Sequence, residues 1–320
     1  MKKSPSIKVI RTIAEMRAFS EAARKKKKNI CLVPTMGGLH DGHLSLVKAA
    51  KRLKKRCDLL VVSIFVNPKQ FAPHEDLENY PRDLDDDLKK LEKLGVETVF
   101  APETEEIFPS GFKTFVEVED LFRRLCGRSR PGHFRGVATV VMKLFNIVRP
   151  QLALFGEKDY QQGLIIRKMA RDLNLEVDVE MRQTVLDKDG LALSTRNSYL
   201  TGDQRPAALS LYRALQVAER LIVSGERNSS IIISNMREVI RSQTGADIDY
   251  IAICHPETLA DLDAVEAKSL IAVAARIGKA RLIDNLFVDL VSLDKREKER
   301  KAKSSEAKKA KAPVRKGSAR

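Results

Sequence analysis

Along the first 180 residues, short continuous apolar runs alternate with longer stretches in which apolar residues recur every three or four positions. The continuous runs predict parallel strands that are covered on both faces. We expect these strands over residues 29–33, 59–66, 96–101, 151–155 and 175–181. The spaced stretches predict amphipathic helices. We expect these helices over residues 12–28, 44–53, 83–94, 136–148 and 164–173.

This alternation of strands and helices predicts an α/β fold, a Rossmann-like doubly wound parallel sheet. The pattern changes after residue 183, where we expect helices over 203–223 and 230–243 and then strands over 249–254, 269–277 and 281–290. We therefore predict a Rossmann-like domain over 1–183, a smaller C-terminal α+β lid domain over 184–293, and a tail over 294–320. Such a lid would exclude water from a reactive intermediate.

The tail holds most of the excess positive charge. The formal net charge is +15, and residues 295–320 contribute +9 of it through 12 Lys and Arg against 3 Glu. A segment so poor in large apolar residues cannot form a core, so we expect it to be disordered. Two interpretations stay open, a solvated extension or a segment that binds an anionic surface such as RNA. Nucleic-acid binding is not expected elsewhere in the chain.

The composition predicts an ordinary globular protein, with 43% apolar and 32% charged residues. No apolar run reaches the roughly 18 residues of a membrane helix, and no hydrophobic segment follows the start as in a secretory signal. The four cysteines form no Cys-x-x-Cys pair, which argues against a disulfide framework or a thiolate zinc site. We expect reduced thiols and a cytoplasmic location.

The first candidate site is the turn between the strand at 29–33 and the following helix. It reads Pro34-Thr35-Met36-Gly37-Gly38-Leu39-His40-Asp41-Gly42-His43. At the carboxyl edge of a parallel sheet, a helix start of this kind offers backbone N–H groups to an anion. The two imidazoles can donate hydrogen bonds to phosphoryl oxygens as negative charge develops. A short His-x-Gly-His motif alone is more often structural, so the strand and helix around it carry the argument.

A second turn with the same architecture follows the strand at 151–155. It reads Gly156-Glu157-Lys158-Asp159-Tyr160-Gln161-Gln162. Lys158 can offset charge on a triphosphate, and Gln162 can point back to the same crevice. Asp159 suits either a nucleotide or magnesium contact or simply a helix N-cap.

Three further segments carry polar side chains with alternative interpretations. Gln70 follows a predicted strand and is either a ligand contact or loop surface. The loop at 128–135, which includes Arg130, either clamps an anion or is surface. The acidic run at 85–87 suggests a metal site, but acidic residues in a first helical turn also offset the helix dipole, which we favour. No metal site made by protein side chains alone is expected.

The motifs together resemble the pantoate–β-alanine ligase family, within the superfamily of His-x-Gly-His nucleotidylyltransferases and class I synthetases. The resemblance covers residues 7–291 and includes Tyr80 in Tyr-Pro-Arg and Arg196 in Ser194-Thr195-Arg196. Thr195 stands where the family usually has Ser, and Lys69 where it often has Met or Leu. The tail lies outside the resemblance.

The resemblance implies ATP-dependent condensation of pantoate with β-alanine through a pantoyl-adenylate, giving pantothenate, AMP and pyrophosphate. ATP would bring Mg²⁺, and the enzyme would be a homodimer. The implied catalytic residues are His40, His43, Lys158 and Arg196, with His43 as proton donor. Substrate would contact Gln70, Gln162, Tyr80 and Arg130. ATP would contact Pro34, Met36, Gly37, Gly38, Leu39, His40, Asp41, Gly42, His43, Gly156, Glu157, Lys158, Asp159, Val185, Leu193, Ser194, Thr195 and Arg196.

Two rival functions share some of these features. A nucleotidylyltransferase that acts on a phosphorylated acceptor would have the same histidine turn but would not use pantoate. A non-enzymatic nucleic-acid binder would depend on the tail, so deletion of residues 295–320 would abolish its function.

Overall fold

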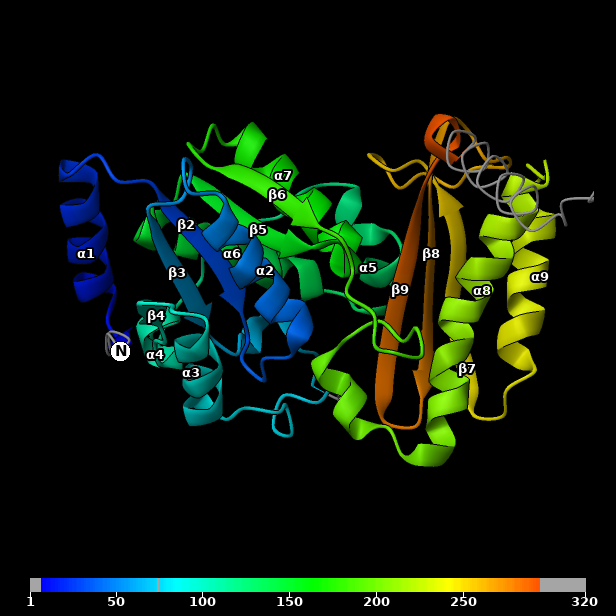
Figure 1. Ribbon diagram of the computed structural model, residues 1–320, viewed down its shortest axis with the longest axis horizontal. Coiled ribbons are helices and arrows are strands. Elements are labelled where there is room, and N and C mark those ends of the chain that lie inside the picture. The colour runs from blue at the N-terminus through cyan, green and yellow to red at the C-terminus, as the bar shows by residue number, and fades with distance from the viewer. Residues whose placement is uncertain (1–6, 74, 294–320) are drawn as a thin grey trace, which may run out of the picture.

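The structure is a computed structural model that describes residues 7–73 and 75–293, so the predicted tail lies outside the described residues. The chain forms two β-sheets that lie side by side (Figure 1). In the described part, no helix is both long and apolar enough to span a lipid bilayer.

The first sheet has six strands, all parallel. They are β1 (Lys8–Ile10), β2 (Ile30–Thr35), β3 (Leu59–Ile64), β4 (Thr98–Phe100), β5 (Leu152–Gly156) and β6 (Asp178–Arg182). Their order in the sheet is β1-β4-β3-β2-β5-β6. The chain moves outward from β2 to β4 and then returns to place β5 on the other side of β2. This return creates a switch point between β2 and β5, where ligands bind in open α/β sheets.

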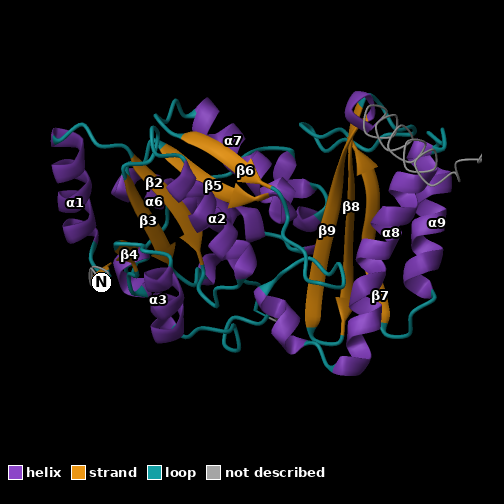
Figure 2. Cartoon of the chain, viewed as in Figure 1, coloured by secondary structure: helices purple, strands orange, loops and turns teal. Residues whose placement is uncertain are grey.

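Helices cover both faces of this sheet (Figure 2). Along β2, Leu32 packs with the cluster of α1 (Ile13–Lys25), α6 (His133–Val148) and α7 (Tyr160–Asp172). Val33 packs on the opposite face with α2 (Asp41–Arg52) and α3 (Leu84–Lys93). Two one-turn helices, α4 (Thr104–Ile107) and α5 (Cys126–Ser129), lie before α6.

The second sheet is antiparallel, and the two helices that precede it in the chain lie on its face away from the first sheet (Figure 2). Its strands are β7 (Ala246–Cys254), β8 (Lys268–Ile277) and β9 (Ala280–Asp289), in that order. The helices α8 (Arg205–Val223) and α9 (Ser229–Arg241) bury this face. Leu270 and Ala272 of β8 join the cluster around α6, so the two sheets share part of one core.

Short 3-10 helices form several connections. They are η1 (Pro68–Gln70), η2 (Leu121–Arg123), η3 (Glu157–Asp159), η4 (Thr195–Tyr199) and η5 (Gly202–Gln204).

The predicted α/β fold with a smaller C-terminal α+β region is confirmed, and most element boundaries agree within three residues. The edge strand β1 was not expected, because three residues are too few to show a pattern. Helix α6 begins three residues earlier than predicted, and β6 begins three residues later. The division at residue 183 stays a prediction, although β6 ends one residue before it.

Candidate active site

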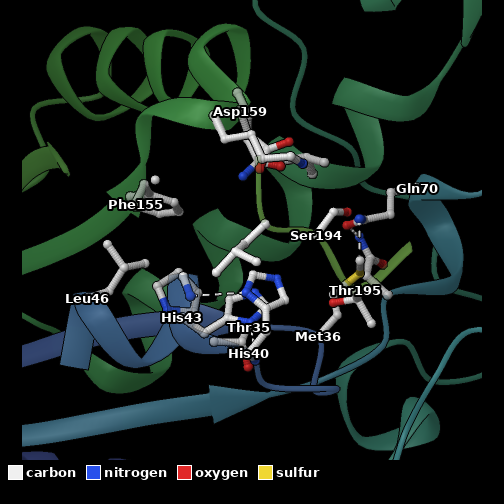
Figure 3. A pocket seen from close by; sticks show the side chains of 18 of the residues that line it. Thr35, Met36, His40, His43, Leu46, Gln70, Phe155, Asp159, Ser194 and Thr195 are labelled. Carbon is white, nitrogen blue, oxygen red and sulfur yellow. Dashed lines mark hydrogen bonds between the residues drawn. The ribbon is translucent and has the colours of Figure 1, made fainter. Parts of the chain in front are cut away.

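A cavity of about 220 Å³ lies at the carboxyl ends of β2 and β5, the switch point of the first sheet (Figure 3). Its walls come from the two predicted turns, from α6, and from residues 183–185 and 193–196. An adjoining cavity of about 70 Å³ shares Lys158, Gln162 and Arg196 with it and extends to Tyr250 and Arg281 of the second sheet. The site therefore faces the second sheet across the switch point.

The histidine turn holds its own imidazoles in place. His40 is the N-cap of α2, and its Nδ1 accepts a hydrogen bond from the Gly42 backbone N–H at 3.1 Å. His43 Nδ1 accepts from the His40 backbone N–H at 3.4 Å, and the two ring centroids lie 4.1 Å apart (Figure 3). Because each Nδ1 accepts, we assign the ring hydrogen of each imidazole to Nε2.

Both imidazoles are neutral near pH 7. Burial, with the Lys158 charge adding to its effect, lowers the pKa of His40 to about 4. Burial, and then the neighbouring His40, lowers the pKa of His43 to about 3. A neutral imidazole can still donate one Nε2–H hydrogen bond to an oxyanion without bringing a fixed charge.

Asp87 fixes the backbone of this turn at Gly38 and Leu39. It is 1% exposed, and its two carboxylate oxygens accept from the backbone N–H groups of Gly38 at 2.9 Å and Leu39 at 2.7 Å. Burial raises the pKa of Asp87, while these two donors oppose the rise. The helix dipole therefore explains the acidic run at 85–87 only in part, because Asp87 also supports the histidine turn. Within residues 7–73 and 75–293, no cluster of three or more His, Cys, Asp or Glu side chains is arranged to hold a metal ion.

The lysine turn after β5 is held from outside. Asn285 of β9 donates through Nδ2 to the carbonyls of Glu157 and Lys158, both at 2.9 Å. Asp159 stands at the N-cap of α7 but makes no capping hydrogen bond, so the interpretation of its side chain as a cap is wrong. Lys158 and Asp159 both line the cavity with no side-chain partner among the described residues.

Gln70 is oriented by a close contact between η1 and α6. The Asn67 amide donates to Gln70 Oε1 at 3.0 Å and to the Gly136 carbonyl at 3.1 Å. A Cβ on Gly136 would lie 2.1 Å from the Lys69 carbonyl oxygen, so only glycine permits this approach. Gln70 Nε2 lies 3.1 Å from the Met36 sulfur (Figure 3).

The neighbouring glutamines of α7 differ in role. Gln161 is 6% exposed and bonds only backbone, donating to the carbonyls of Leu121 and Arg124 and accepting from the N–H of Cys126. Gln162 lines the cavity. Of the pair, Gln162 is the one that can contact a ligand.

Two arginines of the cavity are paired with carboxylates. Arg130 binds Glu75 through Nε and Nη2, both at 2.6 Å. Arg196 binds Asp76 in the same way, at 2.9 and 2.8 Å. Burial opposes ionisation of the two acids, but the arginines outweigh it, and the pKa values of Glu75 and Asp76 are lowered.

Most of the predicted residues meet at this cavity. The predicted residues that line it are Pro34, Met36, His40, Gly42, His43, Gln70, Tyr80, Arg130, Gly156, Lys158, Asp159, Gln162, Val185, Leu193, Ser194, Thr195 and Arg196. Those that do not line it are Gly37, Gly38, Leu39, Asp41 and Glu157. Leu39 is 2% exposed, so it faces the core.

Several lining residues were not predicted. They are Thr35, Leu46, Phe65, Asn67, His133, Val137, Val140, Val141, Leu144, Phe155, Gln183 and Thr184. Thr35 stands inside the first predicted turn, and His133 stands inside the predicted loop at 128–135. The sequence did not indicate that α6 forms an apolar wall of the cavity. A helix that is apolar on nearly all sides has the pattern of a core helix, and this pattern does not show which side faces a ligand.

Comparisons with known proteins agree with this geometry. A family model described as pantoate-beta-alanine ligase matches residues 8–287. The pantothenate synthetase of Thermotoga neapolitana is 52% identical over 282 residues, which are 88% of this chain and 100% of that protein. That of Moorella thermoacetica is 49% identical over 284 residues, which are 89% of this chain and 99% of that protein.

Solved structures give the same result. The pantothenate synthetase of Thermus thermophilus superposes with a TM-score of 0.81 at 45% identity, covering 88% of this chain and 99% of that chain. The pantoate-beta-alanine ligase of Francisella tularensis, in complex with beta-gamma ATP and beta-alanine, gives 0.72 at 33% identity over 88% of this chain and 97% of that chain.

The family match spans both sheets and every segment that lines the cavity. The chain therefore belongs to the pantoate–β-alanine ligase family, a family of ATP-dependent ligases that join pantoate to β-alanine through an amide bond.

Proposed function

We propose that this protein condenses pantoate with β-alanine in two half-reactions. In the first, a carboxylate oxygen of pantoate attacks the α-phosphorus of ATP, the bond to the bridging oxygen breaks, and pyrophosphate leaves. In the second, the amine of β-alanine attacks the acyl carbon of the pantoyl-adenylate. AMP then leaves with the former carboxylate oxygen, and the nitrogen loses its proton as the amide of pantothenate forms.

The observation that carries this proposal is the pair of neutral imidazoles that share one cavity with the ammonium of Lys158, which has no side-chain partner among the described residues. Donors that are fixed before reaction stabilise charge that develops on the phosphoryl oxygens without a cost of reorganisation. His40 and His43 would each offer an Nε2–H group there, with His43 as proton donor, and Lys158 would offset the added charge.

The remaining lining residues suit the substrates. Gln70 and Gln162 would bind the hydroxyls and carboxylate of pantoate, and Ser194 and Arg196 would hold the departing pyrophosphate. Among the residues that line the main cavity, Asp159 is the only carboxylate. It would therefore contact the Mg²⁺ that accompanies ATP as part of that substrate, since carboxylate oxygens are ligands that this ion prefers.

Adenine would lie against the backbone of residues 36–38 and near Val185. The Gly38 N–H already donates to Asp87, so it is not free to bind the base. The base would therefore contact backbone carbonyl groups and side chains.

We further propose, from the family resemblance, a cytoplasmic homodimer. Sedimentation velocity on the full chain would measure its mass in solution.

The test is pyrophosphate release from ATP with pantoate, with β-alanine and with both, in wild type and His43→Ala. Sustained release should need both substrates and fall by about 10²-fold or more in the variant. Release that ignores pantoate would overturn the proposal and favour a nucleotidylyltransferase with a phosphorylated acceptor. Loss of activity on deletion of 295–320 would favour the nucleic-acid alternative.

A further inference from the structure

Two consecutive acidic residues each hold one arginine of the cavity. Glu75 and Asp76 lie in the segment between η1 and α3, and neither is in a helix or strand. Their partners come from separate segments, Arg130 from the end of α5, three residues before α6, and Arg196 from η4. All four side chains are at most 22% exposed, so these are largely desolvated pairs.

The two arginines differ in what remains of their hydrogen-bonding capacity. A guanidinium has five N–H donors. Arg130 gives two to Glu75, a third to the Gln70 carbonyl at 3.4 Å and a fourth to His133 Nε2 at 3.0 Å. His133 Nδ1 lies 2.8 Å from the same Gln70 carbonyl and donates to it, so Nε2 is the acceptor. Arg130 is thus nearly saturated by the protein.

Arg196 is used on one edge only. Its Nε and one N–H of Nη2 go to Asp76, and its other three donors have no partner among the described residues. Asp76 Oδ2 also lies 3.1 Å from the hydroxyl of Tyr199, at the end of the same 3-10 helix. The Tyr80 ring lies 5.6 Å from the guanidinium carbon. Asp76 therefore fixes which edge of Arg196 is left for a ligand.

We propose that Asp76 is a positioning residue that presents the free edge of Arg196 to the leaving pyrophosphate. Its neighbour Glu75 has a different task, because it commits Arg130 to the support of Gln70 and so keeps Arg130 from binding substrate directly. This inference rests on the proposed function, in which Arg196 stabilises the leaving group and Gln70 binds pantoate. Two adjacent carboxylates thereby serve the two substrates of the first half-reaction separately.

The inference predicts different kinetic effects for neighbouring substitutions. Asp76→Asn keeps the shape of the side chain but loses the charge and one acceptor, and kcat for pyrophosphate release should fall about 10-fold or more, with KM for pantoate within about twofold of wild type. Glu75→Gln should raise KM for pantoate about fivefold or more and change kcat little. Equal effects of both substitutions on the same parameter would overturn the assignment.

A double-mutant cycle separates positioning from general damage. If Asp76 acts through Arg196, Asp76→Asn should add almost nothing to the loss in Arg196→Ala. If the kcat losses of the two single variants multiply in the double variant, the inference is overturned. A higher kcat or a lower KM for ATP in Asp76→Asn would also overturn it, because Asp76 would then compete with ATP for Arg196. If Arg196→Ala itself leaves pyrophosphate release unchanged, the proposed function of Arg196 fails first.

A matched control is available outside the cavity. Arg205 binds Asp189 through Nε and Nη2, at 2.7 and 3.0 Å, with the same side-on geometry. Asp189→Asn should leave kcat and both KM values within about twofold. Melting curves of all variants would show whether a kinetic loss reflects unfolding; an Asp76→Asn protein whose kcat loss matches its unfolded fraction would overturn the inference.

Discussion

The turns after β2 and β5 have the same strand, turn and helix architecture and meet at one switch point, yet they are stabilised in different ways. The histidine turn is braced within the first sheet, by caps between its own residues and by the buried carboxylate of Asp87. The lysine turn has no side-chain cap and depends on Asn285 of the second sheet.

The two turns therefore offer a ligand different interactions. In the histidine turn, several backbone N–H groups donate to side chains of the protein and the imidazoles are neutral, so this turn contributes directed hydrogen bonds. The second presents an ammonium and a carboxylate without internal partners among the described residues, so it contributes charge. We therefore expect loss of the Asp87 carboxylate, which braces the histidine turn, to reduce mainly stability, and loss of the Lys158 ammonium, which the lysine turn presents, to reduce rate at nearly constant stability.

The largest expected effect is that of Lys158→Met. Removal of this cation should lower kcat for pyrophosphate release about 10²-fold or more. The melting temperature should change little, because within residues 7–73 and 75–293 the Lys158 ammonium has no hydrogen-bond or ion-pair partner to lose. Steady-state kinetics with saturating ATP would measure kcat. Lys168→Met, on the outer side of α7 and paired with Asp172, is the matched control and should be almost neutral.

Asn285→Ala should lower kcat about 10-fold, because the lysine turn loses both of its bonds to β9. The free energy of unfolding should fall by about 1–2 kcal/mol. Asn285→Asp keeps the volume but cannot donate to carbonyls, so it should be at least as slow. A wild-type rate in either variant would show that the lysine turn, like the histidine turn, supports itself.

Asp87→Asn should act mainly on stability. An amide can accept from only one of the two backbone N–H groups, and leaving the other buried donor unpaired costs about 1–3 kcal/mol. Urea titration would measure this loss, while kcat should fall only a few-fold at temperatures well below the transition. Asp85→Asn, in the same helical turn but exposed, should stay within about 0.5 kcal/mol of wild type. Equal effects of the two would contradict the buttress role.

The smallest effect concerns pH. Unfolded His40 would take up a proton near pH 6.5, whereas the folded pKa is about 4. The contribution of His40 to stability should therefore fall as the pH drops from 6.5 toward 4 and then level off, since the unfolded state binds the extra proton in that window.

His40→Asn keeps an N-cap acceptor for Gly42 and removes this titration. It should be as stable as wild type at pH 7.5 and lose about 1.5 kcal/mol less between pH 6.5 and 5. Denaturant titrations at both pH values would show this, and parallel pH dependences would contradict it.

The sequence pattern predicted the parallel sheet and both turns, because these depend on local pattern and on the rule that parallel strands end at one edge. Other lining residues, such as Tyr80, Val185 and Leu193, came only from the family resemblance. The pattern could not single out Asp87 within its acidic run, because its partners stand 48 and 49 positions earlier in the chain. It also did not predict that Arg130 is consumed by Glu75, 55 positions away. Such contacts are decided by tertiary packing.

The switch point also has a consequence for synthesis of the chain. Strand β2 pairs with β5 through Cys31 and Leu152, and the 120 residues between them must be made before this pairing can form. At typical rates of translation this takes roughly 10 s. During that time β2 to β4 can already pair, but β2 keeps an open strand edge, which is a template for intermolecular association. The geometry that brings the two turns together is thus also the step at which the nascent protein is most exposed to aggregation.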